Sequence, residues 1–166
     1  MKYTLRIHDI IEGTTVDGPG FRTSIYLAGC EHHCQGCHNP QTWDLNGGYE
    51  ISVDDLIKRI IEAGMPVTLS GGDPLVQKEG VKDLCSKLQK KHFNIWLYTG
   101  YIFENLLNTP GYREILEMVD VIVDGPFIEN LKDTSLLFRG SANQRLIDIN
   151  KTLNGDGEIF LWQSDF

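Results

Sequence analysis

The sequence predicts an α/β fold and, more narrowly, a partial (β/α) barrel. Short β-branched or aromatic runs alternate with stretches whose apolar residues recur at helical spacing, which is the pattern of βαβ units around a parallel sheet. Nearly every predicted strand ends in a turn that contains glycine or a polar residue. The chain has 166 residues, whereas a complete eight-unit barrel takes about 250. We therefore expect an open barrel that forms one domain over residues 1–166.

The predicted strands and helices follow one another along the chain. The strands are expected at residues 22–27, 66–70, 94–98, 121–123, 146–149 and 159–162. After the first strand, Ser52 and Asp55 resemble a capping box that begins a helix, and Gly64 ends it. A second helical stripe covers residues 81–88. A third helix, after residue 100, is expected to break near Pro110.

Four turns are predicted to share one edge of the sheet, because the carboxyl ends of parallel strands lie together. They are Gly29-Cys30, Ser70-Gly71-Gly72, Thr99-Gly100 and Asp124-Gly125. Ligands of parallel α/β folds bind at this edge. We therefore expect a functional site built from these four turns.

Composition and charge exclude some classes of partner. The formal net charge is −8, which disfavours nucleic-acid binding, because phosphate contacts need clustered lysine and arginine. The first residues contain no apolar signal-peptide region, and no stretch approaches the roughly 20 apolar residues of a membrane span. We expect a cytoplasmic protein that binds neither nucleic acid nor membrane. Its cysteines are then unlikely to form disulfides.

Three of the four cysteines lie within eight residues, at Cys30, Cys34 and Cys37. This C-x3-C-x2-C spacing, in a loop after a strand, suits an iron–sulfur cluster, which closely spaced thiolates hold. Three thiolates leave one iron of a four-iron cluster without a protein ligand, and an open metal position can bind a substrate. Cys85 lies on an apolar helical stripe and is expected to be a core residue.

The same loop allows a zinc interpretation, with His32, His33 or His38 completing a Cys₃His site. Typical zinc sites use two distant ligand pairs, whereas all these candidates crowd into one loop, which favours the cluster. Without a metal role, His32 and His33 would be exposed loop residues, and His38 would face either a ligand or solvent. Inert, buried cysteines are disfavoured here because the surrounding residues are polar or glycine.

The cysteine spacing, followed one βα unit later by Ser70-Gly71-Gly72-Asp73-Pro74, resembles the radical S-adenosylmethionine superfamily. Residues 15–22 and the segments 37–39 and 42–44 are similar to those of the glycyl-radical-enzyme activases. Among these, the activating proteins of anaerobic ribonucleoside-triphosphate reductases resemble the chain in three further segments, residues 96–101, 123–127 and 138–145. Pyruvate formate-lyase activases resemble only the N-terminal segments and are longer. The resemblance covers residues 13–145.

The resemblance implies a [4Fe-4S] cluster held by Cys30, Cys34 and Cys37, with S-adenosylmethionine bound to the open iron. Reductive cleavage would give methionine and a 5′-deoxyadenosyl radical. The radical would take a hydrogen atom from a backbone glycine of the partner, the large subunit of the anaerobic ribonucleoside-triphosphate reductase. A low-potential donor of the flavodoxin or ferredoxin type would supply the electron.

The resemblance also suggests which residues contact S-adenosylmethionine. They are Gly36, Cys37, His38, Ser70, Gly71, Gly72, Asp73, Thr99 and Asp124. Gly71 and Gly72 would let the backbone approach the methionine amino group, because neither has a Cβ atom. Asp73 would offer that group a negative charge. Most superfamily members have an aromatic residue where this chain has Gly36, whereas the reductase activases also tend to have glycine there. The adenine would then meet backbone or another side chain.

Several roles stay open at this point. Arg139, Asn143 and Gln144 would bind the cofactor, dock the reductase or form a solvated turn. The aromatic residues Trp43, Tyr101 and Phe127 would form a docking surface or belong to the core.

Two other functions remain as alternatives. One is activation of a different glycyl radical enzyme, of the pyruvate formate-lyase kind, or radical chemistry on a small metabolite. The other is a non-catalytic iron–sulfur or zinc protein that transfers electrons or senses oxygen. The Ser70–Pro74 segment disfavours the second, because an electron carrier does not need a cofactor turn.

Overall fold

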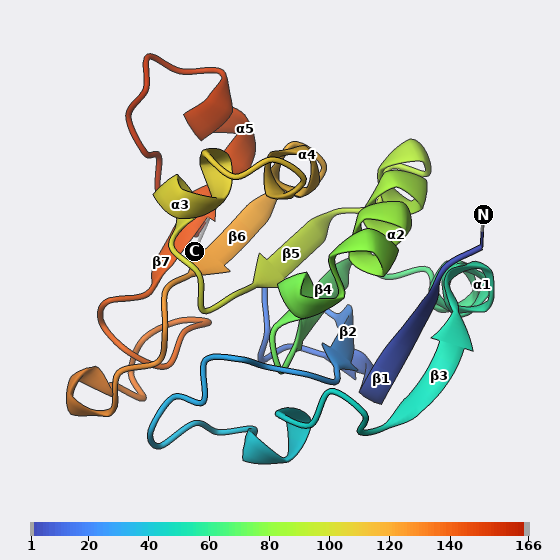
Figure 1. Cartoon of the computed structure of the whole chain (residues 1–166). Coiled ribbons are helices and arrows are strands. Elements are labelled where there is room, and N and C mark those ends of the chain that lie inside the picture. The colour runs from blue at the N-terminus through green and yellow to red at the C-terminus, as the bar shows by residue number, and fades with distance from the viewer. Residues whose placement is uncertain (1, 165–166) are drawn as a thin grey trace.

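The computed structural model describes residues 2–164, which form a seven-stranded sheet with the strand order β3-β1-β2-β4-β5-β6-β7 (Figure 1). The strands are β1 (Thr4–Thr14), β2 (Arg22–Leu27), β3 (Tyr49–Ser52), β4 (Val67–Gly71), β5 (Ile95–Tyr98), β6 (Val121–Asp124) and β7 (Arg145–Asp148). Strands β2, β4, β5 and β6 are parallel, and the remaining pairings are antiparallel. This mixed sheet confirms the predicted partial barrel.

Five α-helices are found among residues 2–164: α1 (Val53–Ala63), α2 (Lys78–Lys90), α3 (Phe103–Leu107), α4 (Tyr112–Leu116) and α5 (Ile149–Leu153). None of the helices in this range has the length and apolar character needed to cross a membrane. Short 3-10 turns occur at Pro40–Thr42, Pro74–Gln77 and Glu129–Leu131. Figure 1 shows the long loops after β2 (blue) and β6 (orange) together, at the end toward which β5 and β6 point.

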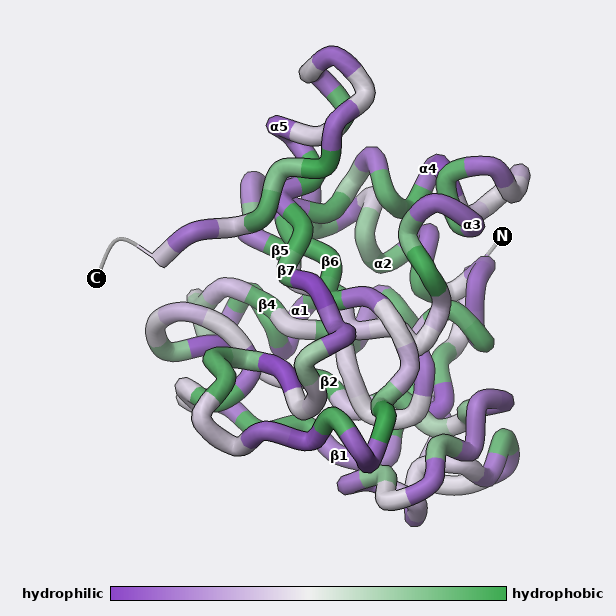
Figure 2. Tube along the Cα trace, turned by 90° about the vertical axis from the view of Figure 1, so that its left-hand side faces the viewer, coloured by the Kyte–Doolittle hydropathy of each residue, from purple (hydrophilic) through white to green (hydrophobic). Residues whose placement is uncertain are grey.

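Side chains of the parallel strands alternate between two faces, as the pleat requires. On β5, Ile95 and Leu97 belong to the large apolar core under the helices, whereas Trp96 and Tyr98 belong to a second cluster on the other, inner face. The strand register places polar residues of β2 and β4 on this inner face, namely Ser24, Tyr26, Thr68 and Ser70. Figure 2 shows hydrophobic segments concentrated in the strands and hydrophilic ones in the outer loops.

The capping signals of the first helix are confirmed. Ser52 Oγ accepts a hydrogen bond of 3.0 Å from the Asp55 amide, and Gly64 ends α1 with a φ of 69°. The predicted break at Pro110 is also found, because α3 and α4 are separate helices with Gly111 between them at a φ of 91°.

Three expectations about the strands were wrong. Strands β1 and β3 were not predicted. Because β1 precedes it, β2 is the second strand of the chain and not the first. Irregular pairing near Asp9 and near Thr14 disturbs the alternation of β1, and β3 has four residues, none of them buried. Residues 159–162 form no strand beyond a single bridge between Leu161 and Ile147. Ile149 starts α5 instead of ending a strand.

Arg22, the first residue of β2, stabilises the edge of the sheet at which the parallel strands begin. Its guanidinium is buried, and desolvation lowers its pKa to about 10. It donates hydrogen bonds to Thr68 Oγ1 (2.9 Å) and Asn94 Oδ1 (2.8 Å), and to the carbonyl oxygens of Val67 (2.9 Å) and Pro19 (3.2 Å). The segment before β2 is thereby tied to β4 and to the start of β5.

Replacing Gly71 with alanine is expected to destabilise the chain more than the same change at Gly13. Both glycines have positive φ, 103° and 79°, which costs an alanine about 1–2 kcal/mol. A Cβ atom on Gly71 would also lie 2.3 Å from the Leu27 amide nitrogen, whereas Gly13 has open space. Such overpacking adds about 1–3 kcal/mol. Urea denaturation measures both free energies of unfolding, and equal losses would contradict the steric argument.

Candidate functional site

A cavity of about 440 Å³ lies at the carboxyl ends of the parallel strands. Each of the four predicted turns contributes to its wall, through Cys30, Ser70-Gly71-Gly72, Thr99-Gly100 and Gly125. Of the residues expected to contact a cofactor, the ones that line this cavity are Cys37, His38, Ser70, Gly71, Gly72 and Thr99. Gly36, Asp73 and Asp124 do not line it. Gly36 has a φ of 76°, and a Cβ atom there would lie 3.0 Å from the side chain of Glu129.

The cysteine loop follows β2, and its two ends lie next to each other. Its ends are joined by hydrogen bonds from the Gly29 amide to the Thr42 carbonyl (2.7 Å) and from the Cys30 amide to the Trp43 carbonyl (3.2 Å). Within the loop, the Cys37 amide donates to the Cys34 carbonyl over 3.1 Å. These bonds hold three half-buried cysteines at the wall of one cavity.

The donor set of this loop fits an iron–sulfur cluster. All three thiols are free and line the same cavity, and the Asn39 amide lies 3.4 Å from Cys37 Sγ, as a donor to a sulfur ligand would. Burial raises the pKa of the Cys30 thiol. Across residues 2–164, no three cysteine, histidine or carboxylate side chains are grouped to hold one metal ion. A four-iron cluster does not require such a group, because each thiolate binds its own iron.

Each histidine of the cysteine loop packs against an aromatic side chain. The ring centroids are 4.5 Å apart for His32 and Tyr101, 4.5 Å for the stacked pair His33 and Trp43, and 5.2 Å for His38 and Phe127. Tyr101, Trp43 and Phe127, the candidates for a docking surface, therefore pack against the histidines of the cysteine loop. His33 and His38 are exposed. His32 is not the exposed loop residue that the alternative without a metal role described, since only 17 % of its side chain is accessible.

Asp73 lies behind the cavity wall and joins three segments. Its carboxylate is buried and accepts hydrogen bonds from Thr99 Oγ1 (2.9 Å), the Gly100 amide (2.9 Å) and the Leu75 amide (3.1 Å). His32 Nε2 lies 2.6 Å from Asp73 Oδ2, and this hydrogen bond raises the pKa of His32. The carboxylate is thus occupied by donors of its own chain, and the geometry does not support the predicted contact with an ammonium group.

The glycines before Asp73 are also needed for the packing of the chain. A Cβ atom on Gly71 would collide with the backbone of Leu27, and one on Gly72 would lie 2.2 Å from the carbonyl oxygen of Gly29 and 2.9 Å from that of Thr42. The missing side chains therefore let β4 and its turn approach β2 and the cysteine loop. Both glycines still present backbone to the cavity.

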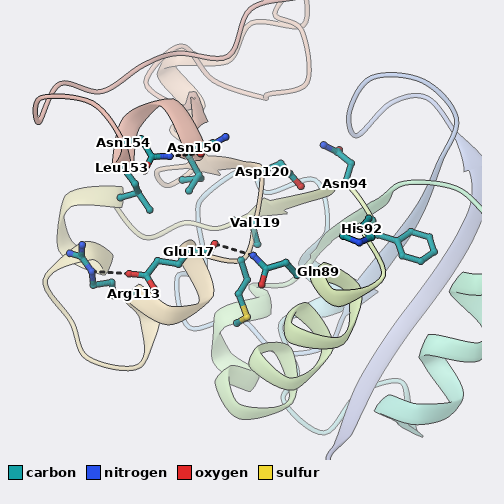
Figure 3. Close-up of a pocket in the computed structure, with 13 residues that line it drawn as sticks. Gln89, His92, Asn94, Arg113, Glu117, Val119, Asp120, Asn150, Leu153 and Asn154 are labelled. Atoms are coloured by element: carbon teal, nitrogen blue, oxygen red, sulfur yellow. Dashed lines mark hydrogen bonds and ion pairs between the residues drawn. The ribbon is translucent and has the colours of Figure 1, made fainter.

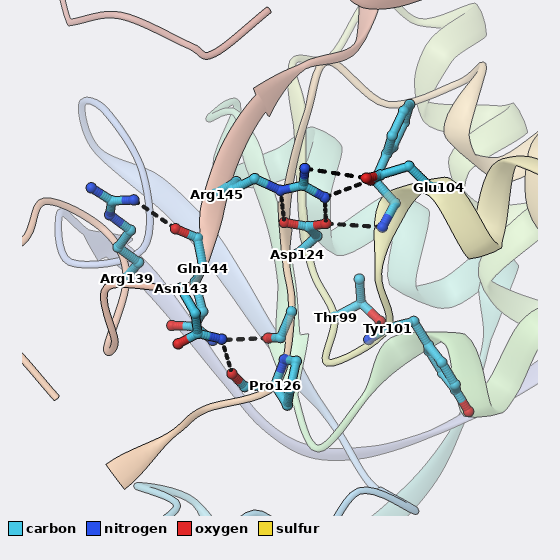
Figure 4. A network of polar contacts seen from close by, with 11 residues as sticks. Thr99, Tyr101, Glu104, Asp124, Pro126, Arg139, Asn143, Gln144 and Arg145 are labelled. Carbon is cyan, nitrogen blue, oxygen red and sulfur yellow. Dashed lines mark hydrogen bonds and ion pairs between the residues drawn. The ribbon is translucent and has the colours of Figure 1, made fainter. Parts of the chain in front are cut away.

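Asp124 is a structural anchor rather than part of the cavity rim (Figure 4). Its buried carboxylate pairs with Arg145 through Nη2 at 2.5 Å and Nε at 3.1 Å, and it accepts a hydrogen bond of 2.9 Å from the Phe103 amide. Arg145 also contacts Glu104 at 2.6 Å. The carboxylate therefore joins β6, β7 and the start of α3, which explains why it faces away from the cavity.

The turn before β7 is hydrogen-bonded to the loop after β6 and is not a solvated turn (Figure 4). Asn143 Nδ2 donates to the Pro126 carbonyl (2.7 Å), and Gln144 Nε2 donates to the Gly125 carbonyl (3.1 Å). Arg139 Nη1 donates to the Gln144 carbonyl (2.6 Å), while its Nε is buried with no hydrogen-bond partner. Asn143 and Gln144 hold the loop after β6, and Arg139 and Gln144 line the cavity.

Several residues of the cavity wall had no predicted role, among them Val16, Asp17, Tyr98 and Phe138. The position of Tyr98 follows from strand alternation, since it shares the inner face with Trp96. Asp17 precedes β2 and accepts a hydrogen bond from the hydroxyl of Tyr26. Asp17 belongs to the segment 15–22 that resembles the activases, but its place at the cavity depends on how this segment packs against Tyr26 of β2 and Thr68 of β4.

A second, larger cavity of about 800 Å³ lies at the amino edge of the sheet, between α2, α4 and α5 (Figure 3). Many of its residues are exposed and polar, and an ion pair joins Arg113 and Glu117 on its wall. It contains no cysteine and none of the predicted site residues. Its size therefore does not make it the better candidate.

Comparisons with known proteins agree with this geometry. Residues 16–147 match the family model of the 4Fe-4S single cluster domain. The anaerobic ribonucleoside-triphosphate reductase-activating protein of Salmonella typhimurium is 36 % identical over 153 residues, 84 % of this chain and 96 % of the relative. The chain belongs to this family of activating proteins. The family member of Escherichia coli K12 is 35 % identical with the same coverage, and that of phage T4 is 38 % identical over 90 % of this chain and 93 % of the relative.

The fold of the family is supported by a solved structure of low sequence identity. QueE from Escherichia coli superposes with a TM-score of 0.52 at 20 % identity, over 73 % of this chain and 70 % of that chain. At this identity the likeness concerns the fold alone.

Replacing Arg145 with leucine is expected to destabilise the chain by about 3 kcal/mol, because the buried Asp124 carboxylate would lose its charged partner. Arg113→Leu is the matched control. It removes an exposed helical pair with Glu117, and such a pair contributes about 0.3–0.5 kcal/mol. Urea denaturation measures both changes. Neither variant should lose iron on reconstitution, since neither arginine lines the cysteine cavity. Loss of iron in folded Arg145→Leu would instead indicate that Asp124 belongs to the functional site.

Proposed function

We propose that this chain activates an anaerobic ribonucleoside-triphosphate reductase by generating a glycyl radical on the reductase's large subunit. The observation that carries the proposal is the cavity at the carboxyl edge of the sheet, where three loop cysteines meet the Ser70–Gly72 turn. Membership of the activating-protein family supports the same function. The seven strands form one sheet, which supports the expectation that residues 1–166 act as one domain.

In this proposal, Cys30, Cys34 and Cys37 hold a [4Fe-4S] cluster. When bound and reduced, the cluster supplies the electron that cleaves S-adenosylmethionine to methionine and a 5′-deoxyadenosyl radical. The chain's own contribution is placement. The Ser70–Gly72 turn offers backbone groups to the cavity, and Cys37 and His38 offer backbone groups to the same cavity. Thr99 orients the turn through its hydrogen bond to Asp73.

The inner face of the sheet limits the access of water to this cavity. Tyr98 and Phe138 form part of its wall, and the Tyr98 hydroxyl donates to the Phe138 carbonyl over 2.7 Å. Burial raises the pKa of Tyr98, which keeps this phenol neutral. A radical needs such shielding from solvent. A flavodoxin or ferredoxin as electron donor, and a cytoplasmic location, belong to the same proposal.

The decisive experiment is carried out without oxygen. The chain is loaded with iron and sulfide, reduced and mixed with S-adenosylmethionine, and 5′-deoxyadenosine and methionine are measured. The large reductase subunit is then added, and electron paramagnetic resonance detects the glycyl radical. We expect both products and the radical. Intact S-adenosylmethionine even with the reductase present would instead support an electron carrier or a zinc site.

Changing Cys30, Cys34 or Cys37 to alanine is expected to abolish cluster binding and product formation. Cys85→Ala is the matched control and should keep both, because Cys85 is fully buried in the core, where its pKa rises to about 12. Iron and sulfide analysis of the reconstituted proteins checks this. Loss of iron in a folded Cys85→Ala protein, or a full cluster in any loop variant, would contradict the proposed ligands.

A further inference from the structure

The cysteine loop has few attachments to the rest of the chain. Its ends are held by the backbone hydrogen bonds at Gly29 and Cys30. Within the part of the chain that the structure describes, residues 31–38 make one hydrogen bond to a residue outside the loop, from His32 Nε2 to Asp73 Oδ2 at 2.6 Å. The position of the loop over the cavity therefore depends strongly on this contact.

Asp73 carries the contact further into the sheet edge. The same carboxylate accepts hydrogen bonds from Thr99 Oγ1 and from the Gly100 amide, and it caps the 3-10 turn through the Leu75 amide. His32 is thus joined through one buried group to the turn after β4 and to the loop after β5. Both of these segments line the cavity with the cysteines.

The loop after β5 is shaped to receive the His32 ring. A Cβ atom on Gly100 would lie 2.7 Å from His32 Cδ2 and 2.8 Å from its Nε2. The rings of Tyr101 and His32 also pack in an edge-to-face arrangement, with centroids 4.5 Å apart. The Thr99-Gly100-Tyr101 segment therefore provides a hydrogen bond to Asp73, space for the ring and a wall beside it.

The other two histidines of the loop lack such a link. His33 stacks on Trp43, which lies close in sequence, and His38 contacts Phe127. Among residues 2–164, neither of them donates a hydrogen bond to a residue beyond the loop. His33 is therefore a matched control, because it belongs to the same loop and packs on an aromatic ring at the same centroid distance.

We propose that His32 is a positioning residue, which fastens the cysteine loop to the Asp73 turn so that cluster and S-adenosylmethionine are held in one fixed arrangement. This inference rests on the proposed function. His32 lines the cavity beside the cysteines, and in this proposal it acts through Asp73 rather than on the reacting atoms. Its removal should leave cluster assembly largely intact and weaken the binding of S-adenosylmethionine.

The test compares His32→Phe, which keeps a ring beside Tyr101 but loses the donor, with His32→Gln, whose side-chain amide restores a donor at a similar reach. His33→Phe is the control. Each full-length chain is reconstituted, its iron and sulfide are measured, and S-adenosylmethionine is titrated while the spectrum of the reduced cluster is recorded. We expect near-native iron in all three. The dissociation constant should rise about tenfold in His32→Phe, as loss of one hydrogen bond to a charged group implies, with recovery in His32→Gln and no change in His33→Phe.

A second measurement needs no metal. Hydrogen exchange in the metal-free chains reports on the Gly100 amide, which donates a hydrogen bond to the Asp73 carboxylate. The protection of this amide from exchange should be lost in His32→Phe and kept in His33→Phe. Gly100→Ala, which displaces the ring from the other side, should behave as His32→Phe does. Native affinity and native protection in both variants would overturn the inference. A native chain that never cleaves S-adenosylmethionine would contradict the proposed function, and the exchange data would still decide the role of His32.

Discussion

The arrangement of the site depends on the burial of one carboxylate, that of Asp73. A buried carboxylate is costly unless donors surround it, and here the donors come from the cysteine loop, the turn after β4 and the loop after β5. A shift of any one of these three segments would remove at least one of the hydrogen bonds that this carboxylate accepts. The crowding around this group also explains why Gly72 and Gly100 cannot carry a side chain.

Arg22 joins separate segments at the edge where the parallel strands begin, as Asp73 does at the edge where they end. Here the buried group is a cation instead of an anion. Within the described part of the chain it has no carboxylate partner at hydrogen-bonding distance, and its donors bind hydroxyl, amide and carbonyl oxygens of three segments. Its guanidinium lies 5.5 Å from the centre of the Trp96 ring. This attachment brings the segment before β2 onto the inner face, where Asp17 reaches the cavity. The two edges are thus fixed independently of each other.

Local patterns were sufficient for the parallel core and for the location of the site. The cysteine spacing, the Ser70–Gly72 turn and the caps of α1 are determined by neighbours in the sequence, and each was found where expected. Strand β1 was missed because its irregular pairing hides the alternation that identifies a strand. Asp73 and Asp124 were assigned to the cofactor because both follow a strand at the correct edge. Which way such a side chain turns depends on partners distant in sequence, His32 for one and Arg145 for the other.

The outer strands β3 and β7 stand at opposite ends of the strand order and do not pair with each other. A closed barrel surrounds its contents with strands, whereas here the wall is incomplete between these two edges. A large protein that binds along this gap would supply the missing side of the enclosure. Exclusion of water would then arise on complex formation, and a reactive species would be protected only when its target is already in place. The open edge of the sheet would in this way couple the timing of the chemistry to the arrival of the partner.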